Sequence, residues 1–194
     1  DIHQPQRHAL LFFSIFFFFF FFTFTNATHA FSADLVDRTC RTCSAAPTSI
    51  DFPFCVAPLR AVPVSRAANL PGLALVSMDM TLHNATAAIP IIIAHLAVPS
   101  PDPLAAAPLE DCLEVYADAV AALGNAVAAF MGGRSGAAEA WVGSVVEGAV
   151  RCEKGFKQKE GEAPPLSREN YDLLQLSGLA LCILQMITAP GMAA

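Results

Sequence analysis

Residues 112–152 read CLEVYADAVAALGNAVAAFMGGRSGAAEAWVGSVVEGAVRC. In the first half of this segment, large apolar side chains recur every three or four residues, the spacing that keeps one face of a helix buried. They are Tyr116, Val120, Leu123, Val127 and Phe130. Two glycines then interrupt the pattern, and the buried side of a second helix would carry Trp141, Val145, Ala149, Cys152 and Phe156. We therefore expect two helices joined by a glycine turn and packed as an antiparallel hairpin.

The cysteines at the two ends of this segment lie equally far in sequence from Gly132. Folding the segment back on itself brings Cys112 and Cys152 to nearly the same height, so we expect a disulfide between them. In the loop-entropy model, closing a loop of this length stabilises a fold by roughly 4 kcal/mol.

The chain holds six cysteines, all of them after its apolar N-terminal stretch, which indicates an oxidising compartment. Cys40 and Cys55 flank a short proline-containing segment and are the expected second pair, with Cys43 as an alternative partner for Cys55. Cys43 and Cys182 are then free-thiol candidates, and Cys182 would act as a small buried hydrophobe on an apolar helix. Six cysteines allow fifteen pairings, so spacing alone does not decide among them.

The apolar N-terminal stretch has the features of a secretory signal. Residues 9–24 include an unbroken run of phenylalanines, Arg7 precedes them, and Thr28 and Ala30 supply small residues where a signal peptidase reads. The stretch is shorter than the ~20 residues that a membrane-spanning helix needs. We expect residues 1–30 to be removed, leaving residues 31–194 as one secreted domain with no membrane contact.

The expected domain consists of a helical hairpin and a bundle. In residues 31–62, one short helix would run from a cap at Ser32 to Arg41, and another from Phe54 to just before Pro63. Residues 67–188 would hold four longer helices with short or proline-stiffened connections. The expected fold class is all-α: an antiparallel up-down four-helix bundle with an N-terminal helical hairpin extension and two disulfides.

The first bundle helix is expected over residues 67–96. Its main apolar stripe would be Leu73, Met80, Ala87 and Ile91. Pro90 should kink or break the helix, because proline removes a backbone donor. Asn84 begins an Asn-Ala-Thr sequon and is a glycosylation candidate. A stiff linker to the next helix would follow, made by Pro99, Pro101, Pro103 and Pro108.

The last bundle helix follows a charged connection at residues 157–162. Ser167 is expected to cap it, in a capping-box arrangement with Asn170. Its apolar stripe would be Leu173, Leu176, Ala180, Ile183 and Ile187. The helix should end near Pro190, because a helix seldom continues up to a proline.

The sequence contains no pattern typical of a catalyst, a metal site or a cofactor site. The formal net charge of −6, without a basic patch, argues against nucleic acid as a partner. His83 and His95 lie too far apart on one helix to share a metal. The glycine-rich residues 132–136 lack the lysine of a phosphate loop and the serine placement of a nucleophile elbow. These features favour a protein that binds a partner and is not itself an enzyme.

Six short segments, in this order, carry a family likeness. They are LVDRTC at 35–40, FPFCV at 52–56, LEDCLEVYADA at 109–119, WVGS at 141–144, CEKGF at 152–156 and LSREN at 166–170. With them the chain resembles the plant invertase and pectin methylesterase inhibitor family, and most closely its pollen-allergen branch, which is labelled as invertase inhibitors. The likeness covers roughly residues 33–187.

The resemblance implies a four-helix bundle with an N-terminal hairpin, no catalytic activity, and secretion to the cell wall or apoplast. It implies the disulfides Cys40–Cys55 and Cys112–Cys152, the pairs that spacing also favoured, whereas Cys43 departs from the family pattern. Members bind one of two secreted carbohydrate enzymes and block its substrate cleft.

The resemblance also bears on the target. Invertase inhibitors of this family carry a Pro-Lys-Phe motif where this chain has Ser135, Gly136 and Ala137, whereas Trp141 and the three residues after it look more like the pectin methylesterase branch. We therefore favour pectin methylesterase as the partner. Exposed candidates for contact with the target are Glu114, Asp118, Asn125, Arg134, Glu139 and Glu147. The alternatives are an inhibitor of acid invertase and, in another class, a secreted structural or allergen-like bundle without an enzyme target.

Overall fold

Helices make up nearly all of the part of the chain that the computed structural model describes, which is residues 35–45, 50–98, 106–156 and 164–189. An N-terminal helix covers residues 35–45. The elements that follow are α2 (Phe52–Ala61), the 3-10 helix η1 (Pro63–Ala67), α3 (Leu70–Ala97), α4 (Ala106–Met131), α5 (Ser135–Phe156) and α6 (Ser167–Thr188). None of the described residues lies in a β-strand.

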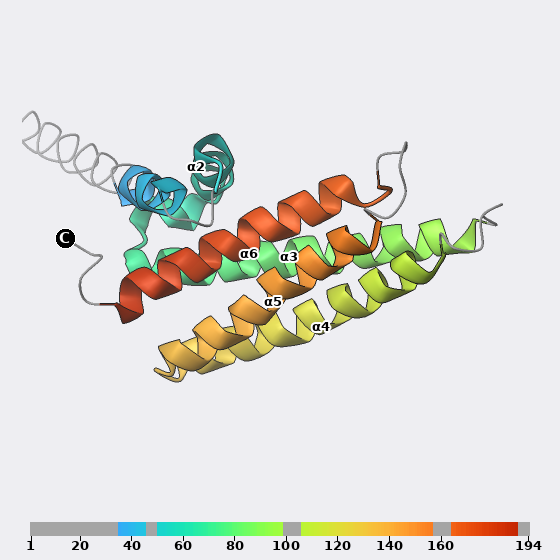
Figure 1. Cartoon of the computed structure of the whole chain (residues 1–194). Coiled ribbons are helices and arrows are strands. Elements are labelled where there is room, and N and C mark those ends of the chain that lie inside the picture. The colour runs from blue at the N-terminus through green and yellow to red at the C-terminus, as the bar shows by residue number, and fades with distance from the viewer. Residues whose placement is uncertain (1–34, 46–49, 99–105, 157–163, 190–194) are drawn as a thin grey trace, which may run out of the picture.

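The four long helices form a bundle, as the sequence predicted. α4 packs against α3 and α5, and α6 packs against α5 and α3, so the four helices close a ring in which α3 and α5 are diagonal. Figure 1 shows these helices side by side, with α2 and the N-terminal helix on the outer side of α6. The core therefore lies between α3, α4, α5 and α6, and the short helices add a layer over one of them.

The hairpin of α4 and α5 is held at both ends and in the middle. At the turn, Gly133 has a φ of 73°, a conformation that favours glycine. At the other end, the Cys112–Cys152 disulfide joins the helices with the two Cα atoms 5.0 Å apart. Between them, a Cβ on Gly148 would lie 3.1 Å from Val115 Cγ1, so glycine allows α5 to approach α4 closely. The predicted antiparallel hairpin and its bridge are thus present.

Alanine is the commonest residue in the α4 core, with four of the nine buried positions. The buried residues of α4 are Leu109, Cys112, Val115, Tyr116, Ala119, Ala122, Leu123, Ala126 and Ala129. Val120, Val127 and Phe130 pack only at the edge of the core, half-buried. The prediction that Trp141 is buried was wrong, because its side chain is 43% exposed. Small residues let the helices approach closely, which pushes larger side chains to the edges of the contact.

The apolar stripe expected on the first bundle helix was correct in its first half, where Met80 also packs against the core, and wrong in its second half. Leu73 is buried, but Ala87 and Ile91 are exposed, and the core side of α3 includes Ser77 and Thr81. Ser77 Oγ donates to Ala74 O at 2.9 Å and Thr81 Oγ1 donates to Ser77 O at 2.7 Å. Because these hydroxyls are satisfied by the backbone of their own helix, they can be buried at little cost.

The ends of α3 differ from the expectation as well. Residues 63–67 form η1, so α3 begins at Leu70, where Asn69 Oδ1 accepts a hydrogen bond from Gly72 N at 2.9 Å. This N-cap satisfies one of the free amides of the first turn. The expected break at Pro90 does not occur, since α3 remains one helix through it to Ala97.

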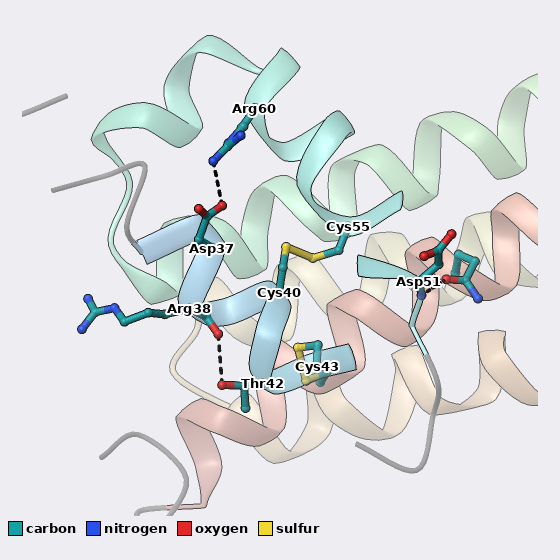
Figure 2. Close-up of a disulfide and its surroundings, with 10 residues drawn as sticks. Asp37, Arg38, Cys40, Thr42, Cys43, Asp51, Cys55 and Arg60 are labelled. Atoms are coloured by element: carbon teal, nitrogen blue, oxygen red, sulfur yellow. Dashed lines mark hydrogen bonds and ion pairs between the residues drawn. A yellow bond between two sulfur atoms is a disulfide. The ribbon is translucent and has the colours of Figure 1, made fainter. Parts of the chain in front are cut away.

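The prediction that Cys43 and Cys182 are free thiols was wrong, and the fold has three disulfides where two were expected. Cys43 is bonded to Cys182, with Cα atoms 5.8 Å apart and 139 residues between them in sequence. Figure 2 shows this bridge one helical turn from the Cys40–Cys55 disulfide. The sequence signal for Cys182, an apolar flank, correctly indicated burial but carried no information on its partner.

α6 carries a stripe of residues that contact the short helices, which we call the docking stripe. It consists of Tyr171, Gln175, Gly178 and Cys182, at steps of four, three and four. Gln175 Oε1 accepts from Asp51 N at 2.9 Å, and Ile50 Cδ1 lies 3.1 Å from where a Cβ on Gly178 would be. α6 is therefore covered on both sides, which explains why it is apolar almost all round.

The short helices are joined to one another by several contacts. The Cys40–Cys55 disulfide is present, with Cα atoms 5.7 Å apart. Arg60 Nη2 lies 2.8 Å from Asp37 Oδ1, a pair that Figure 2 shows at the outer edge. The Phe54 ring meets the Tyr171 ring of α6 edge to face, with centroids 5.6 Å apart. The expected N-terminal hairpin is thus present, and it packs against α6.

Several helices begin or end at other residues, or with other caps, than the sequence predicted. Pro108 lies in the first turn of α4 and not in a linker; the first turn tolerates proline because its amides have no partner within the helix. Ser167 does not cap α6, since its Oγ donates to Pro164 O at 2.9 Å, and Asn170 is buried. α2 begins at Phe52, earlier than expected, and the N-terminal helix continues past Arg41.

Some expectations fall outside the described residues. They concern the signal at residues 1–30, the cap at Ser32, the prolines at 99, 101 and 103, and the charged connection at 157–162. Within the described chain, three helices are long and apolar enough to cross a membrane by length and composition alone: α3, α4 and α6. In the structure these three helices pack against one another and α5 as the bundle.

Candidate protein-binding face

The candidate contact residues on α4 share one side of that helix. Glu114, Asp118 and Asn125 are separated by four and seven residues, a spacing that places them on one face, and all three are exposed. α4 has four carboxylates, Glu110 and Asp111 being the other two, and it contains no lysine or arginine. This side of α4 is therefore acidic along its N-terminal half.

α5 contributes the neighbouring edge of the same surface. Gly148 lies against Val115 of α4, and Trp141 and Ser144 lie seven and four residues before Gly148, on the same side of α5. Both are exposed, as is Glu147. Because the Cys112–Cys152 bridge sets the two helices level, Asp118 lies at the height of residue 146. We call the surface formed by Glu114, Asp118, Asn125, Trp141, Ser144 and Glu147 the outer face.

Two of the predicted contact residues lie elsewhere. Arg134 is exposed in the turn between α4 and α5, where its amide donates to Ala129 O. Glu139 is half-buried, and its Oε2 accepts a hydrogen bond from Thr188 Oγ1 of α6 at 3.1 Å. Glu139 therefore faces α6 and does not join the outer face.

The exposure of Trp141 is the feature of this face that sequence reasoning missed. The indole of Trp141 is exposed to 43%, so a large apolar ring lies at the surface of the bundle. The helical spacing placed it with the buried residues because it lies one helical turn from Val145 on the same edge of α5. Only the position of α4 decides that the ring points outward.

A shallow groove of about 330 Å³ lies between the end of α5 and the start of α6. Its lining includes Glu153, Lys154 and Asn170, and beneath it lies a chain of hydrogen bonds. Tyr116 OH donates to Asn170 Oδ1 at 3.3 Å, and Asn170 Nδ2 donates to Glu153 Oε2 at 3.1 Å. We call these three residues the polar relay; sequence reasoning had assigned Asn170 to a capping box and Tyr116 to an apolar stripe.

Burial and nearby carboxylates keep the Tyr116 phenol of the polar relay protonated. Burial raises the pKa of Tyr116 far above its ordinary value, and the carboxylates of Glu169, Asp172 and Glu153 raise it further. The phenol is therefore a neutral donor at any physiological pH. Burial also raises the pKa of Asp172; Arg168 opposes this shift and Glu169 adds to it. The arrangement suits a structural network that joins α4, α5 and α6.

The glycosylation candidate lies in the middle of α3. The Asn84 side chain is half-buried, and its Oδ1 is buried without a hydrogen-bond partner among the described residues. Thr86 of the same sequon is exposed and donates to Leu82 O at 2.8 Å. Attachment of a glycan at Asn84 stays a prediction.

Histidine, cysteine, aspartate and glutamate side chains are spread over the described ranges of the chain. Within them, no group of three or more histidine, cysteine, aspartate or glutamate side chains could hold a metal ion. His83 and His95 are both exposed on α3, three helical turns apart. The arrangement that stands out chemically is therefore the exposed, acidic outer face with its single indole.

Comparison with known proteins identifies relatives of the whole described bundle. Residues 34–183 match the family described as plant invertase/pectin methylesterase inhibitor. A protein of Platanus orientalis named "Putative invertase inhibitor" is 32% identical over 141 residues, which are 73% of this chain and 82% of that protein. A protein of the same name from Platanus acerifolia is 31% identical, over 73% of this chain and 78% of its own length.

Two solved structures have a similar fold. A mutant form of a pectin methylesterase inhibitor from Arabidopsis aligns with a TM-score of 0.60 at 24% identity, over 70% of this chain and 89% of that one. A pectin methylesterase inhibitor from Arabidopsis thaliana aligns with a TM-score of 0.57 at 21% identity, over 74% of this chain and 91% of that one. These matches support the bundle with its N-terminal hairpin as the fold.

Proposed function

Because this chain belongs to the plant invertase and pectin methylesterase inhibitor family, we propose that it is a secreted inhibitor of pectin methylesterase that covers the substrate cleft of that enzyme with its outer face. The observation that carries the proposal is the rigid, exposed surface of α4 and α5, which is acidic on its α4 side. Secretion is supported by the apolar residues 1–30 and by three disulfides, which form in oxidising compartments.

Rigidity suits the outer face to inhibition. The two helices that present it are tied by the Cys112–Cys152 bridge and by the close approach at Gly148. A surface that is already ordered loses little conformational entropy on binding, so more of the contact energy appears as affinity. Inhibitors that block an enzyme cleft in this way typically bury about 1,600 Å² in total.

Trp141 is the expected centre of the contact. Tryptophan is enriched among the residues that dominate binding energy, because its large ring loses water over a wide area when a partner covers it. The surrounding carboxylates of Asp118 and Glu147 would form a polar rim that attracts a basic enzyme. The chain thus offers an apolar anchor within a charged border.

Two features favour pectin methylesterase over invertase. Ser135, Gly136 and Ala137 stand where the resemblance places the Pro-Lys-Phe motif of invertase inhibitors, and none of them has a side chain that can reach into a cleft. Trp141 and Ser144, by contrast, belong to the WVGS segment that resembles the pectin methylesterase branch. Acid invertase is the second candidate, favoured by the names of the two Platanus relatives.

A paired assay tests the proposal. The protein, purified from the medium of cells that secrete it, is titrated against plant pectin methylesterase and against acid invertase. We expect inhibition of the first enzyme, and we expect Trp141→Ala to weaken that inhibition by about 10- to 100-fold, the range for a residue that dominates an interface.

Val64→Ala is the matched control, since Val64 is also an exposed apolar side chain, at 62%, but lies on η1. It should leave inhibition unchanged. Inhibition of invertase alone would establish the second candidate. Activity of both enzymes that is unaffected by any excess of the protein would leave a bundle without an enzyme target, and the proposal would be wrong.

A further inference from the structure

The C-terminal half of α3 exposes an unusual amount of apolar surface. Only 22% of the most apolar stretch of α3 is buried, against 39% for α4 and 61% for α6. Ile91 and Val98 are exposed to 38% and 65% and lie seven residues apart, so they share one face of the helix. Ile93, exposed to 50%, lies on another side of the helix. Scattered apolar residues on a surface are ordinary, but a contiguous patch marks an interaction site.

Among ionisable side chains, the same segment carries only the two histidines, His83 and His95. Residues 80–98 contain no aspartate, glutamate, lysine or arginine, although the whole chain has a net charge of −6. Two copies that met through this segment would keep their carboxylates apart. A charged partner would gain nothing here, because the segment offers no opposite charge. The charge distribution therefore favours a second copy of the chain as the occupant.

The exposed residues repeat at the spacing of a helix pair. Ala87, Ile91, Ala94 and Val98 follow one another at steps of four, three and four, the pattern of an interhelical seam, and all four are exposed. We propose that this stripe, which we call the α3 seam, pairs with the α3 seam of a second copy, the two helices running antiparallel about a two-fold axis.

Side-chain size supports this geometry. With the axis midway between residues 92 and 93, Ala87 of one copy lies level with Val98 of the other, and Ile91 lies level with Ala94. A small residue then faces a large one at every level of the seam. In an interface with two-fold symmetry the same surface is used by both copies, so that surface must be complementary to itself. A parallel pairing would place Ile91 against Ile91 and Ala87 against Ala87, and would leave gaps.

The pairing is compatible with the proposed inhibitory function and does not depend on it. α3 and α5 are diagonal in the bundle, so a second copy on α3 leaves the α5 side of the outer face open. The dimer would carry two outer faces and could therefore bind two enzyme molecules at once. Where enzyme molecules are held close together in the cell wall, this bivalent binding would be tighter than binding through one face. A seam of about three helical turns is small, so we expect a weak dimer with a Kd in the micromolar range.

The mass of the secreted protein in solution tests the proposal. After enzymatic removal of any N-glycan, light scattering coupled to gel filtration should give twice the chain mass at about 100 μM and a falling mean mass towards about 1 μM, the span of a weak dimer. Ala94→Glu puts a carboxylate opposite the partner's Ile91 at both of the middle levels of the seam. It should raise the dimer Kd at least tenfold without lowering the melting temperature, because Ala94 is exposed in the single chain.

A second variant and a control make the geometry specific. In I91K/A94E, the antiparallel seam sets each introduced lysine level with an introduced glutamate of the other copy, so dimer formation should return. Val64→Glu, at an exposed apolar site on η1, should leave the dimer unchanged. A monomeric wild type at about 100 μM would overturn the proposal. So would a dimer that A94E leaves intact, one that V64E weakens as much as A94E does, or one that I91K/A94E does not regain.

Discussion

Single polar residues join the helices of this bundle at points where the sequence pattern suggested only apolar contacts. The polar relay runs from Tyr116 of α4 through Asn170 of α6 to Glu153 of α5, and Asn170 is only 3% exposed. A buried amide in that position must keep its partners, because an unsatisfied polar group costs about 1–3 kcal/mol. The relay therefore holds three helices in one relative arrangement.

Tyr116→Phe should lower the free energy of unfolding by about 1–2 kcal/mol, because it removes the donor to Asn170 Oδ1 and leaves that oxygen buried without a partner. Denaturant unfolding at neutral pH measures the change. Asn170→Ala tests the coupling: in the background of Asn170→Ala, Tyr116→Phe should cost much less. Equal costs in the two backgrounds would show that the hydroxyl does not act through Asn170.

Among the helices, α6 packs against other elements on two of its sides. One side of it belongs to the bundle core, and the docking stripe on the other side receives the short helices. Gln175 is a polar residue within this apolar helix, yet it is only 8% exposed, and its oxygen accepts a hydrogen bond from Asp51 N. A helix covered on two sides needs apolar or satisfied residues almost all round.

Replacing both cysteines of the third bridge, as C43S/C182S, should loosen the short helices from α6 while the bundle stays folded. The loop-entropy model gives an upper figure of about 5 kcal/mol for a loop of this length. Hydrogen exchange should speed up in residues 35–61 and stay slow in α4 and α5. C112S/C152S is the matched control, and it should loosen α4 and α5 at the bridged end. Unchanged exchange in residues 35–61 of C43S/C182S would mean that the docking stripe suffices without its disulfide.

Across the whole molecule, charge is distributed unevenly. α4 carries four carboxylates without a lysine or arginine, whereas residues 80–98, on and just after the adjacent helix, contain no aspartate, glutamate, lysine or arginine. The acidic outer face and the uncharged α3 seam are thus separate surfaces with different kinds of partner. The charges of the outer face should attract a basic enzyme over a distance, whereas the α3 seam should contribute only when the two surfaces are in contact.

Association with pectin methylesterase should slow as salt is added, because the Debye length falls from about 30 Å at 0.01 M to about 8 Å at 0.15 M ionic strength. E114Q/D118N should slow association at low ionic strength and should approach the wild-type rate at high ionic strength. Glu139→Gln removes a charge that faces α6 and should change the rate less. Surface-binding kinetics at the two salt concentrations measure these rates. A salt-independent rate for the wild type would contradict a role for the acidic surface.

Much of the fold could be predicted from the sequence, because its signals are local. The spacing around Tyr116 and Leu123 and the glycines at 132 and 133 specify two helices and a turn whatever lies beside them. Cys112 and Cys152 lie equally far in sequence from Gly132, and this spacing identified the bridge between them. Of the candidate site, Glu114, Asp118, Asn125 and Glu147 were expected to be exposed, and they are. That these residues form one surface could be seen only from the way α5 packs against α4 in the structure.

What the sequence by itself determined is the set of helices, the turn at Gly133, the family likeness and two of the bridges, since each depends on residues close in the chain or on a recognisable order of segments. The tertiary structure alone decided which side of each helix is covered. Ser77 is buried and Ile91 exposed, Trp141 points outward, and Cys43 meets Cys182. The physical reason is that helical spacing places residues on a common face, but whether that face is buried depends on which helix packs against it.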